Sequence, residues 1–231
     1  GNREEALRTS RRLVARVTPD LAAVPPLEMF VPTPLFVMVR FGLWPEILAE
    51  PAPAAELRYA RGIWRYARGL ALAATGRADS AGREYDSLAA IAEALPADFT
   101  VSINSGRAVL QVAAHALAGE IAARQGQTRE AIHHLEEAVR FEDALNYDEP
   151  PAWPLSVRQS LGAVLLAAGR AADAEAVYRA DLRKYPANGW SLYGLERALR
   201  ARRASAAADS VRGEFARAWA RADVQLTGSR F

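Results

Sequence analysis

The sequence predicts an all-α protein built from consecutive helical hairpins, and three observations support this prediction. Hydrophobic residues make up 51% of the 231 residues, which excludes a disordered chain. Ala, the residue with the highest helix propensity, supplies about one residue in five. Glycines recur at a fixed spacing in three separate segments, which indicates a repeated structural unit.

The repeated pattern has two glycines seven residues apart, an Ala five residues after the second Gly and a Tyr or Leu nine residues after it. The second Gly suits the end of a helix, where a left-handed backbone costs least without a Cβ. The first Gly and the Ala suit the closest crossing of two antiparallel helices, with the Tyr or Leu filling the space between repeats. The pattern therefore predicts a helix-turn-helix unit. Its three copies are Gly69, Gly76, Ala81, Tyr85; Gly119, Gly126, Ala131, Leu135; and Gly162, Gly169, Ala174, Tyr178.

Two weaker units come first along the chain. Residues 1–18 carry Gly1 and Ala6 in the register of a second helix, so we expect a truncated repeat and a chain that begins in mid-repeat. Residues 28–54 form a degenerate repeat that turns at Gly42. The prolines of EPAP shorten the second helix of that repeat.

The rest of the chain divides into three clear repeats and a capping hairpin. The clear repeats span 55–95, 105–145 and 151–186. The capping hairpin, 187–223, lacks a turn Gly but keeps apolar residues at helical spacing. We expect residues 1–231 to form a single solenoid domain. The apolar residues of the cap are Val211, Phe215 and Trp219.

The glycine pattern resembles the tetratricopeptide repeat (TPR), whose unit is 34 residues long. Gly76 follows Gly42 by 34 residues, Gly126 follows Gly76 by 50, and Gly169 follows Gly126 by 43. The wider spacings place insertions of sixteen and nine residues between standard units. In KYPANGW a proline ends one helix and Trp190 opens the next, as in this family. The resemblance covers nearly the whole chain and implies a right-handed superhelix of about five hairpins.

Three segments look, more narrowly, like the C-terminal half of a group of largely uncharacterised bacterial TPR-containing proteins. These segments are RFGLWPEILAEP, YARGLALAATGR and YDEPPAWPLSVRQSLGAVLLAAGR. Members of that group carry His-rich motifs in an N-terminal half, and no such motif occurs in this sequence. This sequence therefore lacks the residues that a metal or catalytic role of those histidines would require.

Composition and motifs argue against several classes of function. The formal net charge of +2 does not indicate nucleic-acid binding, and no apolar run reaches the ~18 residues of a membrane span. The chain has no Cys, no phosphate loop, no nucleophile elbow and no HExxH motif. We therefore expect no enzyme activity in this chain and no cofactor. We expect a soluble protein, with a cytoplasmic location favoured because no targeting segment is present.

Two of the three histidines stand next to each other in TREAIHHLEEAVR. Glu130 and His134, or His133 and Glu137, are four residues apart and could share a metal ion. Ordinary charge pairs on a helix surface have the same spacing, and a metal site needs three or four ligands. We expect no metal site.

Arginines recur at intervals of three and four along one predicted helix. A solvated face is the favoured interpretation, and recognition of a carboxylate or phosphate in a groove is the alternative. Arg65 shares its register with His115 and Arg158, each four residues before the first Gly of its repeat. Polar groups at that register either face a ligand or, as we favour, hydrogen-bond to neighbouring helix ends and inserted loops. The arginines of this stripe are Arg58, Arg61, Arg65 and Arg68.

First helices line the concave surface in the TPR family, so the resemblance implies which residues face a groove. The first-helix register holds Arg40, Tyr66, Glu120, Arg124, Ser156, Gln159, Asn188 and Ser191. In the inserted NYDEPPAWP, Tyr147 and Trp153 either plug the gap between repeats, which we favour, or present an aromatic wall to a ligand. The candidate peptide- or ligand-binding residues are Arg61, Arg65, Tyr66, Glu120, Arg124, Tyr147, Trp153, Arg158, Gln159 and Trp190.

The leading interpretation is a protein–protein interaction scaffold that binds a peptide or partner protein in the concave groove or at the loop rim. The alternative is the C-terminal part of a larger enzyme or small-molecule sensor, with a pocket lined by Arg and aromatic residues. Self-association through an uncovered terminal repeat is a further possibility.

Overall fold

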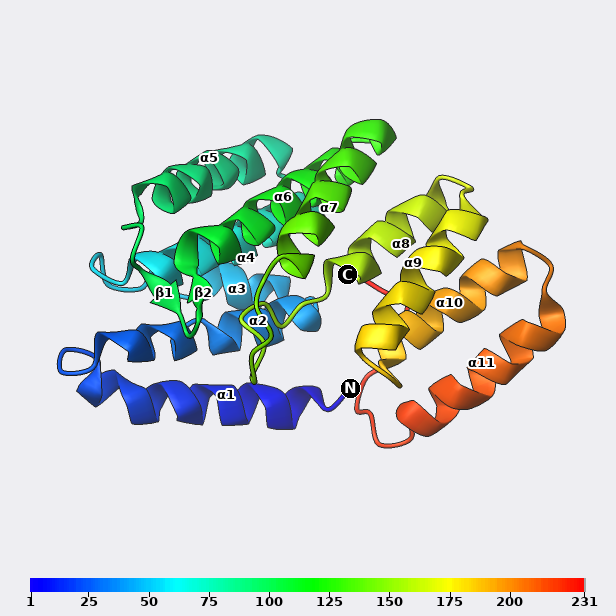
Figure 1. Cartoon of the computed structure of the whole chain (residues 1–231), viewed down its shortest axis with the longest axis horizontal. Coiled ribbons are helices and arrows are strands. Elements are labelled where there is room, and N and C mark those ends of the chain that lie inside the picture. Colours follow the sequence, from blue (N-terminus) through cyan, green and yellow to red (C-terminus); the bar gives the residue numbers. More distant parts are fainter. Residues whose placement is uncertain (231) are drawn as a thin grey trace. The chain divides into compact units, whose positions relative to one another are not determined.

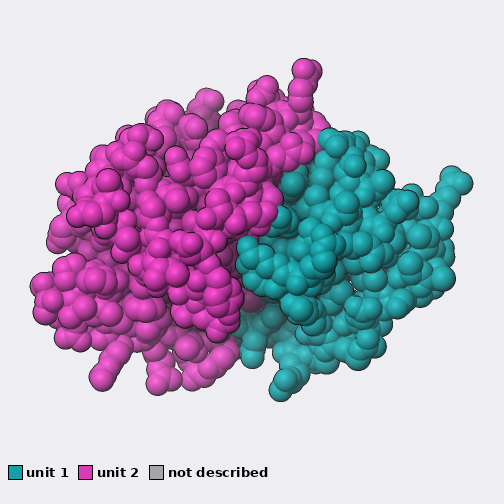
Figure 2. All heavy atoms as spheres, viewed as in Figure 1, with its two compact units in different colours: residues 1–4, 156–231 teal, residues 5–155 magenta. Residues whose placement is uncertain are grey.

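A computed structural model of the chain describes residues 1–230 and is helical along most of its length (Figure 1). It contains two compact units, shown in different colours in Figure 2. Unit 1 comprises Gly1–Glu4 and Ser156–Phe231, and unit 2 comprises Glu5–Leu155. The predicted all-α fold of helical hairpins is confirmed.

Unit 2 contains three helical hairpins, α2/α3, α4/α5 and α6/α7. Helix α4 packs on α2, α5 and α6, so the first helices of successive hairpins are neighbours. The elements in chain order are α1 (Arg3–Val17), the 3-10 helices η1 (Thr18–Asp20) and η2 (Pro25–Phe30), α2 (Thr33–Arg40), α3 (Trp44–Ala49), α4 (Arg58–Ala74), α5 (Ala78–Ala94), β1 (Thr100–Val101), β2 (Asn104–Ser105), α6 (Gly106–Arg124) and α7 (Thr128–Asp143).

Unit 1 contains two hairpins, α8/α9 and α10/α11, and ends in a segment without helix or strand. Helix α8 packs on α9 and α10, and α10 packs on α9 and α11, which repeats the arrangement of unit 2. The four helices are α8 (Val157–Ala167), α9 (Ala171–Lys184), α10 (Gly189–Ala201) and α11 (Ser205–Ala218).

Each hairpin turns through a residue with a left-handed backbone, as the glycine pattern predicts. In the last hairpin, where no Gly is available, Arg203 takes this conformation with a φ of 61°. The turn keeps the same closing bond, because the Ala204 N–H donates to the Leu199 carbonyl at 2.9 Å. The turn glycines are Gly42 (φ 64°), Gly76 (77°), Gly126 (76°) and Gly169 (75°).

The first glycines of the pattern lie at close helix crossings. A Cβ on Gly119 would lie 2.6 Å from Leu135 Cγ, and a Cβ on Gly162 would lie 2.5 Å from Tyr178 Cζ, so neither position has room for a side chain. Leu135 and Tyr178 are fully buried, as predicted. Tyr85, at the equivalent position of the remaining copy, is only half-buried and lines an open groove. The prediction that Tyr85 fills this space is therefore wrong.

The two insertions both fold onto unit 2 and bind each other. The first contains a short antiparallel pair, Thr100–Val101 with Asn104–Ser105, which the sequence did not indicate. Asn104 Oδ1 accepts from the Asn146 N–H at 2.7 Å, and Asn104 Nδ2 donates to the Asn146 carbonyl at 3.3 Å. Arg40 Nη2 donates to the Pro154 carbonyl at 3.1 Å. One side-chain amide and one guanidinium thus hold the two ends of the second insertion.

Candidate functional site

The arginine stripe of α4 binds groups of its own unit. Glu84, a buried residue of α5, accepts from Arg65 Nη1 at 2.7 Å and from Arg68 Nε at 3.3 Å. Both guanidinium groups also lie over the Trp64 ring, 4.9 and 4.7 Å from its centroid. A carboxylate removed from water needs such counter-charges, so this ion-pair cluster fastens α4 to α5.

The other arginines of the stripe bind backbone carbonyls. Arg61 Nη1 donates to the Pro53 carbonyl at 3.0 Å, and Arg58 Nη1 donates to the Ala94 carbonyl at 3.4 Å, at the end of α5. Arg58 is exposed, but Arg61 is half-buried, as are the two arginines that bind Glu84. The arginines of the stripe therefore bind groups of their own unit. Only Arg58 lies on a solvated face.

Trp153 is the plug of the second insertion. Its side chain is 2% exposed and makes edge contacts with Phe36, 5.5 Å between ring centroids, and with Tyr66, 5.2 Å. The plug interpretation is confirmed for Trp153. Tyr147, from the same insertion, is 81% exposed, so the plug interpretation is wrong for Tyr147.

Tyr66 is 5% exposed, so it belongs to the core and does not line a surface groove. Burial raises the pKa of Tyr66, and the charge of nearby Glu120 raises it further while that of Arg40 lowers it. Glu120 is itself buried. The first-helix register of unit 2 thus supplies an internal polar cluster around Tyr66, and Trp153 of the second insertion covers this ring.

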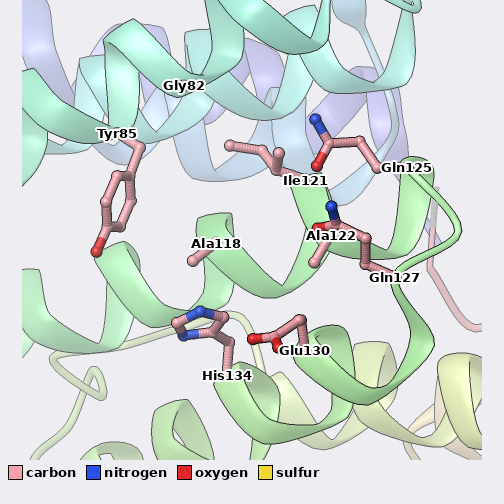
Figure 3. A pocket seen from close by; sticks show the side chains of 9 residues that line it. All are labelled: Gly82, Tyr85, Ala118, Ile121, Ala122, Gln125, Gln127, Glu130 and His134. Carbon is pink, nitrogen blue, oxygen red and sulfur yellow. The ribbon is translucent and has the colours of Figure 1, made fainter.

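A groove that the sequence did not indicate lies between the second helices α5 and α7 (Figure 3). Its volume is about 380 Å³, and its floor is formed by α6. Tyr85 enters from the α5 side, and Glu130 and His134 enter from α7. The groove is lined by Gly82, Tyr85, Ala118, Ile121, Ala122, Gln125, Gln127, Glu130 and His134.

His134 contacts a second imidazole beside this groove. Its Nδ1 lies 3.5 Å from Nδ1 of His115, which stacks on Phe141 with a centroid distance of 5.2 Å. Burial lowers the pKa of both His115 and His134, and the charge of His134 lowers that of His115 further. Within residues 1–230, no cluster of three or more His, Cys, Asp or Glu side chains could hold a metal ion. Because the pKa of each imidazole is lowered, the neutral form of both His115 and His134 is favoured near pH 7. Their contact joins α6 to α7.

Unit 1 has a buried polar network centred on Asp181 of α9. Asp181 is 0% exposed and accepts from the hydroxyls of Ser156 and Ser191, one at each neighbouring first helix. Gln159 Nε2 lies 3.3 Å from Ser191 Oγ and 3.5 Å from Asp181. The side chain of Gln159, a predicted groove residue, therefore lies in the interior of unit 1.

Gln159 also presents its backbone carbonyl to the segment that follows α11. Ser229 Oγ donates to this carbonyl at 3.0 Å and lies 2.6 Å from the Tyr178 hydroxyl. Burial raises the pKa of Tyr178 to about 12, so the hydroxyl is neutral and available for this bond. In Figure 1 the segment runs, in red, from the end of α11 back to the C label beside α8.

The ten predicted site residues do not form one cluster. In unit 2, Tyr66, Glu120 and Trp153 are buried together, Arg61 and Arg65 bind their own unit, and Arg124 and Tyr147 are exposed. In unit 1, Gln159 is buried and Arg158 is half-buried. Trp190 is half-buried and meets Trp219 edge-on at 4.7 Å. The chain segment held by Tyr178 and Gln159 was missed, and the only sequence signal for it was the spacing of Gly162 and Gly194 along two first helices.

Comparison with known proteins identifies the fold. No protein-family model and no curated protein matches the chain. One crystal structure of nearly identical TPR-like repeats, from a Podosopora anserina protein described as a kinesin light chain, matches with a TM-score of 0.50 and 19% identity. The match covers 93% of this chain and 94% of that one. A second crystal structure of these repeats gives a TM-score of 0.49 at 19% identity, over 93% of this chain and 95% of that one.

The first of these likenesses shows that the chain has a TPR-like helical-repeat fold. Among residues 1–230, no helix is both long and apolar enough to cross a membrane.

Proposed function

We propose that this protein is an interaction scaffold that binds a partner polypeptide on the face of its first helices, the concave surface of the TPR-like fold. One observation carries the proposal: in unit 1, a stretch of polypeptide without helix or strand already lies on α8 and α10. We call this face, formed around Gln159, Ala163, Gly194 and Arg197, the first-helix surface of unit 1.

The composition of this surface suits a peptide ligand. It offers a cavity of about 320 Å³ bordered by small and aliphatic residues of α8, with the Arg197 guanidinium and the Tyr178 hydroxyl as polar groups. Apolar walls with a few fixed polar groups are the usual make-up of a site that orients an extended chain. The residues around the cavity are Ala163, Leu166, Ala167, Tyr178, Gly194, Arg197, Gly228 and Ser229.

Site-specific photo-crosslinking tests the proposal. A benzoylphenylalanine in place of Ala167, an exposed residue at the rim of the cavity, should crosslink a partner polypeptide in cells that produce the protein. The same group in place of Arg183, an exposed residue of the second helix α9, is the control. Crosslinks from both positions in equal yield, or from neither, would contradict binding at the first-helix surface.

A second candidate function rests on the groove between α5 and α7. Its volume of about 380 Å³ falls within the range of small-molecule pockets, and Tyr85, Glu130 and His134 offer polar groups on two sides. This supports the sensor alternative in a modified form, since the described residues that line the groove include Tyr85 and no arginine. A ligand screen by thermal shift, with Ala118→Leu as the variant that fills the floor, would test it. Stabilising compounds that act equally on the variant would count against the groove.

A further inference from the structure

The segment after α11 lies with one side against unit 1. From residue 221 to residue 228 exposed and half-buried residues alternate strictly, and Ser229 is buried. A period of two is the pattern of a non-helical segment that rests alternate side chains on a surface. The side chains facing the unit are those of Ala222, Val224 and Leu226, followed by Gly228.

The start of the segment is fastened at two points. Trp219 Nε1 donates to the Val224 carbonyl at 2.8 Å. The Asp223 carboxylate accepts from the Glu4 N–H at 3.0 Å and from the Arg3 N–H at 2.7 Å, which lowers the pKa of Asp223. These contacts direct the following residues toward the first-helix surface.

The end of the segment is held at a gap between two first helices. Tyr178 belongs to the second helix α9, yet its hydroxyl reaches the first-helix surface because Gly162 and Gly194 leave room for its ring. A Cβ on Gly162 would lie 2.5 Å from the ring, and a Cβ on Gly194 would lie 2.2 Å from it. The hydroxyl and the Gln159 carbonyl together form a site for a single hydroxyl group, which Ser229 occupies.

The segment does not fill this surface completely. A cavity of about 320 Å³ remains beside Gly228 and Ser229.

We propose that residues 222–230 are an internal occupant of the peptide site and that the partner carries a segment of matching chemistry. The partner's segment has apolar residues at alternate positions, followed by a Ser whose hydroxyl takes the place of that of Ser229. The inference rests on the proposed function and adds the partner's chemistry and its competition with residues 222–230. Binding of the partner requires that this segment leave the first-helix surface.

Fluorescence anisotropy with labelled synthetic peptides tests this inference on the full chain. The probes are a peptide with the sequence of residues 220–230 and its S229A form. The proteins are the unchanged chain, the double variant Leu226→Asp with Ser229→Ala, and the control Thr227→Ala, which alters an exposed residue of the same segment. Circular dichroism checks that each protein keeps its helices.

We expect the double variant to bind the peptide with the unchanged sequence of residues 220–230 at least about tenfold more tightly than the unchanged chain does, because the site is no longer occupied. Thr227→Ala should match the unchanged chain, and the S229A peptide should bind most weakly. Ser229→Ala alone, a milder change, should shift affinity in the same direction. Equal affinities for all proteins, or no binding to any, would overturn the inference. A dimer of the unchanged chain in light scattering that becomes a monomer in the double variant would also overturn it, because the segment would then bind a second copy.

Failure of this inference can be told apart from failure of the proposed function. If the Ala167 crosslinker captures a partner segment without this pattern, the scaffold function stands and the assigned chemistry falls. If neither crosslinker nor peptide finds the first-helix surface, both fall.

Discussion

Replacing Trp153 by Ala tests whether the second insertion is a structural plug or a binding wall. The indole is 2% exposed and lies between the rings of Phe36 and Tyr66. Truncating a buried Trp removes its transfer free energy and leaves a cavity, which costs ~3–5 kcal/mol. For a chain of this size each kcal/mol lowers Tm by ~2–4 °C, so Tm should fall by ~6–20 °C.

Two variants sharpen the measurement by urea unfolding. Tyr147→Ala, in the same insertion but at an 81% exposed residue, should change the free energy of unfolding by less than ~0.5 kcal/mol. Trp153→Phe should be milder than Trp153→Ala, because the ring contacts remain and Nε1 has no hydrogen-bond partner among the described residues. If Trp153→Ala unfolds at the same urea concentration as the unchanged protein, the plug interpretation is wrong.

Three further predictions concern the polar groups of the two units. Glu84→Gln should destabilise by ~1–3 kcal/mol in urea unfolding, whereas Glu93→Gln, at a 72% exposed carboxylate, should change little; equal effects would contradict the cluster on α4 and α5. Because burial lowers the folded-state pKa of His115 and His134, their contribution to stability is complete above the usual His value of 6.5 and is lost as pH falls below it. The urea midpoint should therefore be lower at about pH 5.5 than at about pH 7.5, and the double variant His115→Gln with His134→Gln should show a smaller difference. If the double variant keeps the full pH dependence, these histidines do not cause it. Asp181→Asn should cost ~1–3 kcal/mol, since a fully buried acceptor of two hydroxyl bonds is replaced by a group that also donates; a neutral result would mean that the network rearranges freely.

The sequence predicts features of this fold that depend on local conformation. The glycine turns follow from a backbone requirement that one residue type meets best, and their φ angles agree. The close crossing at Gly162 follows from the same pattern. The aromatic plug at Trp153 follows from size alone, because large rings usually bury area.

Features that depend on pairing between distant residues could not be predicted. The sequence around Tyr66 does not indicate that the second insertion covers this side chain. The sequence around Glu84 does not indicate that it forms ion pairs with two arginines of the preceding helix. The contact between Ser229 and Tyr178 joins residues 51 positions apart. The only sequence feature related to this contact is the pair Gly162 and Gly194. Both leave room for the Tyr178 ring, and this shared role can be seen only in the structure.

Hydrogen exchange of residues 222–230 in the full chain tests the central claim most directly. If this segment occupies the first-helix surface of unit 1, its amides should exchange more slowly than those of a free peptide of the same sequence. A saturating concentration of the peptide with the sequence of residues 220–230 should then accelerate their exchange while α8 and α10 stay protected. Bound peptide with no change in exchange at 222–230 would contradict the account, because segment and partner would occupy different places.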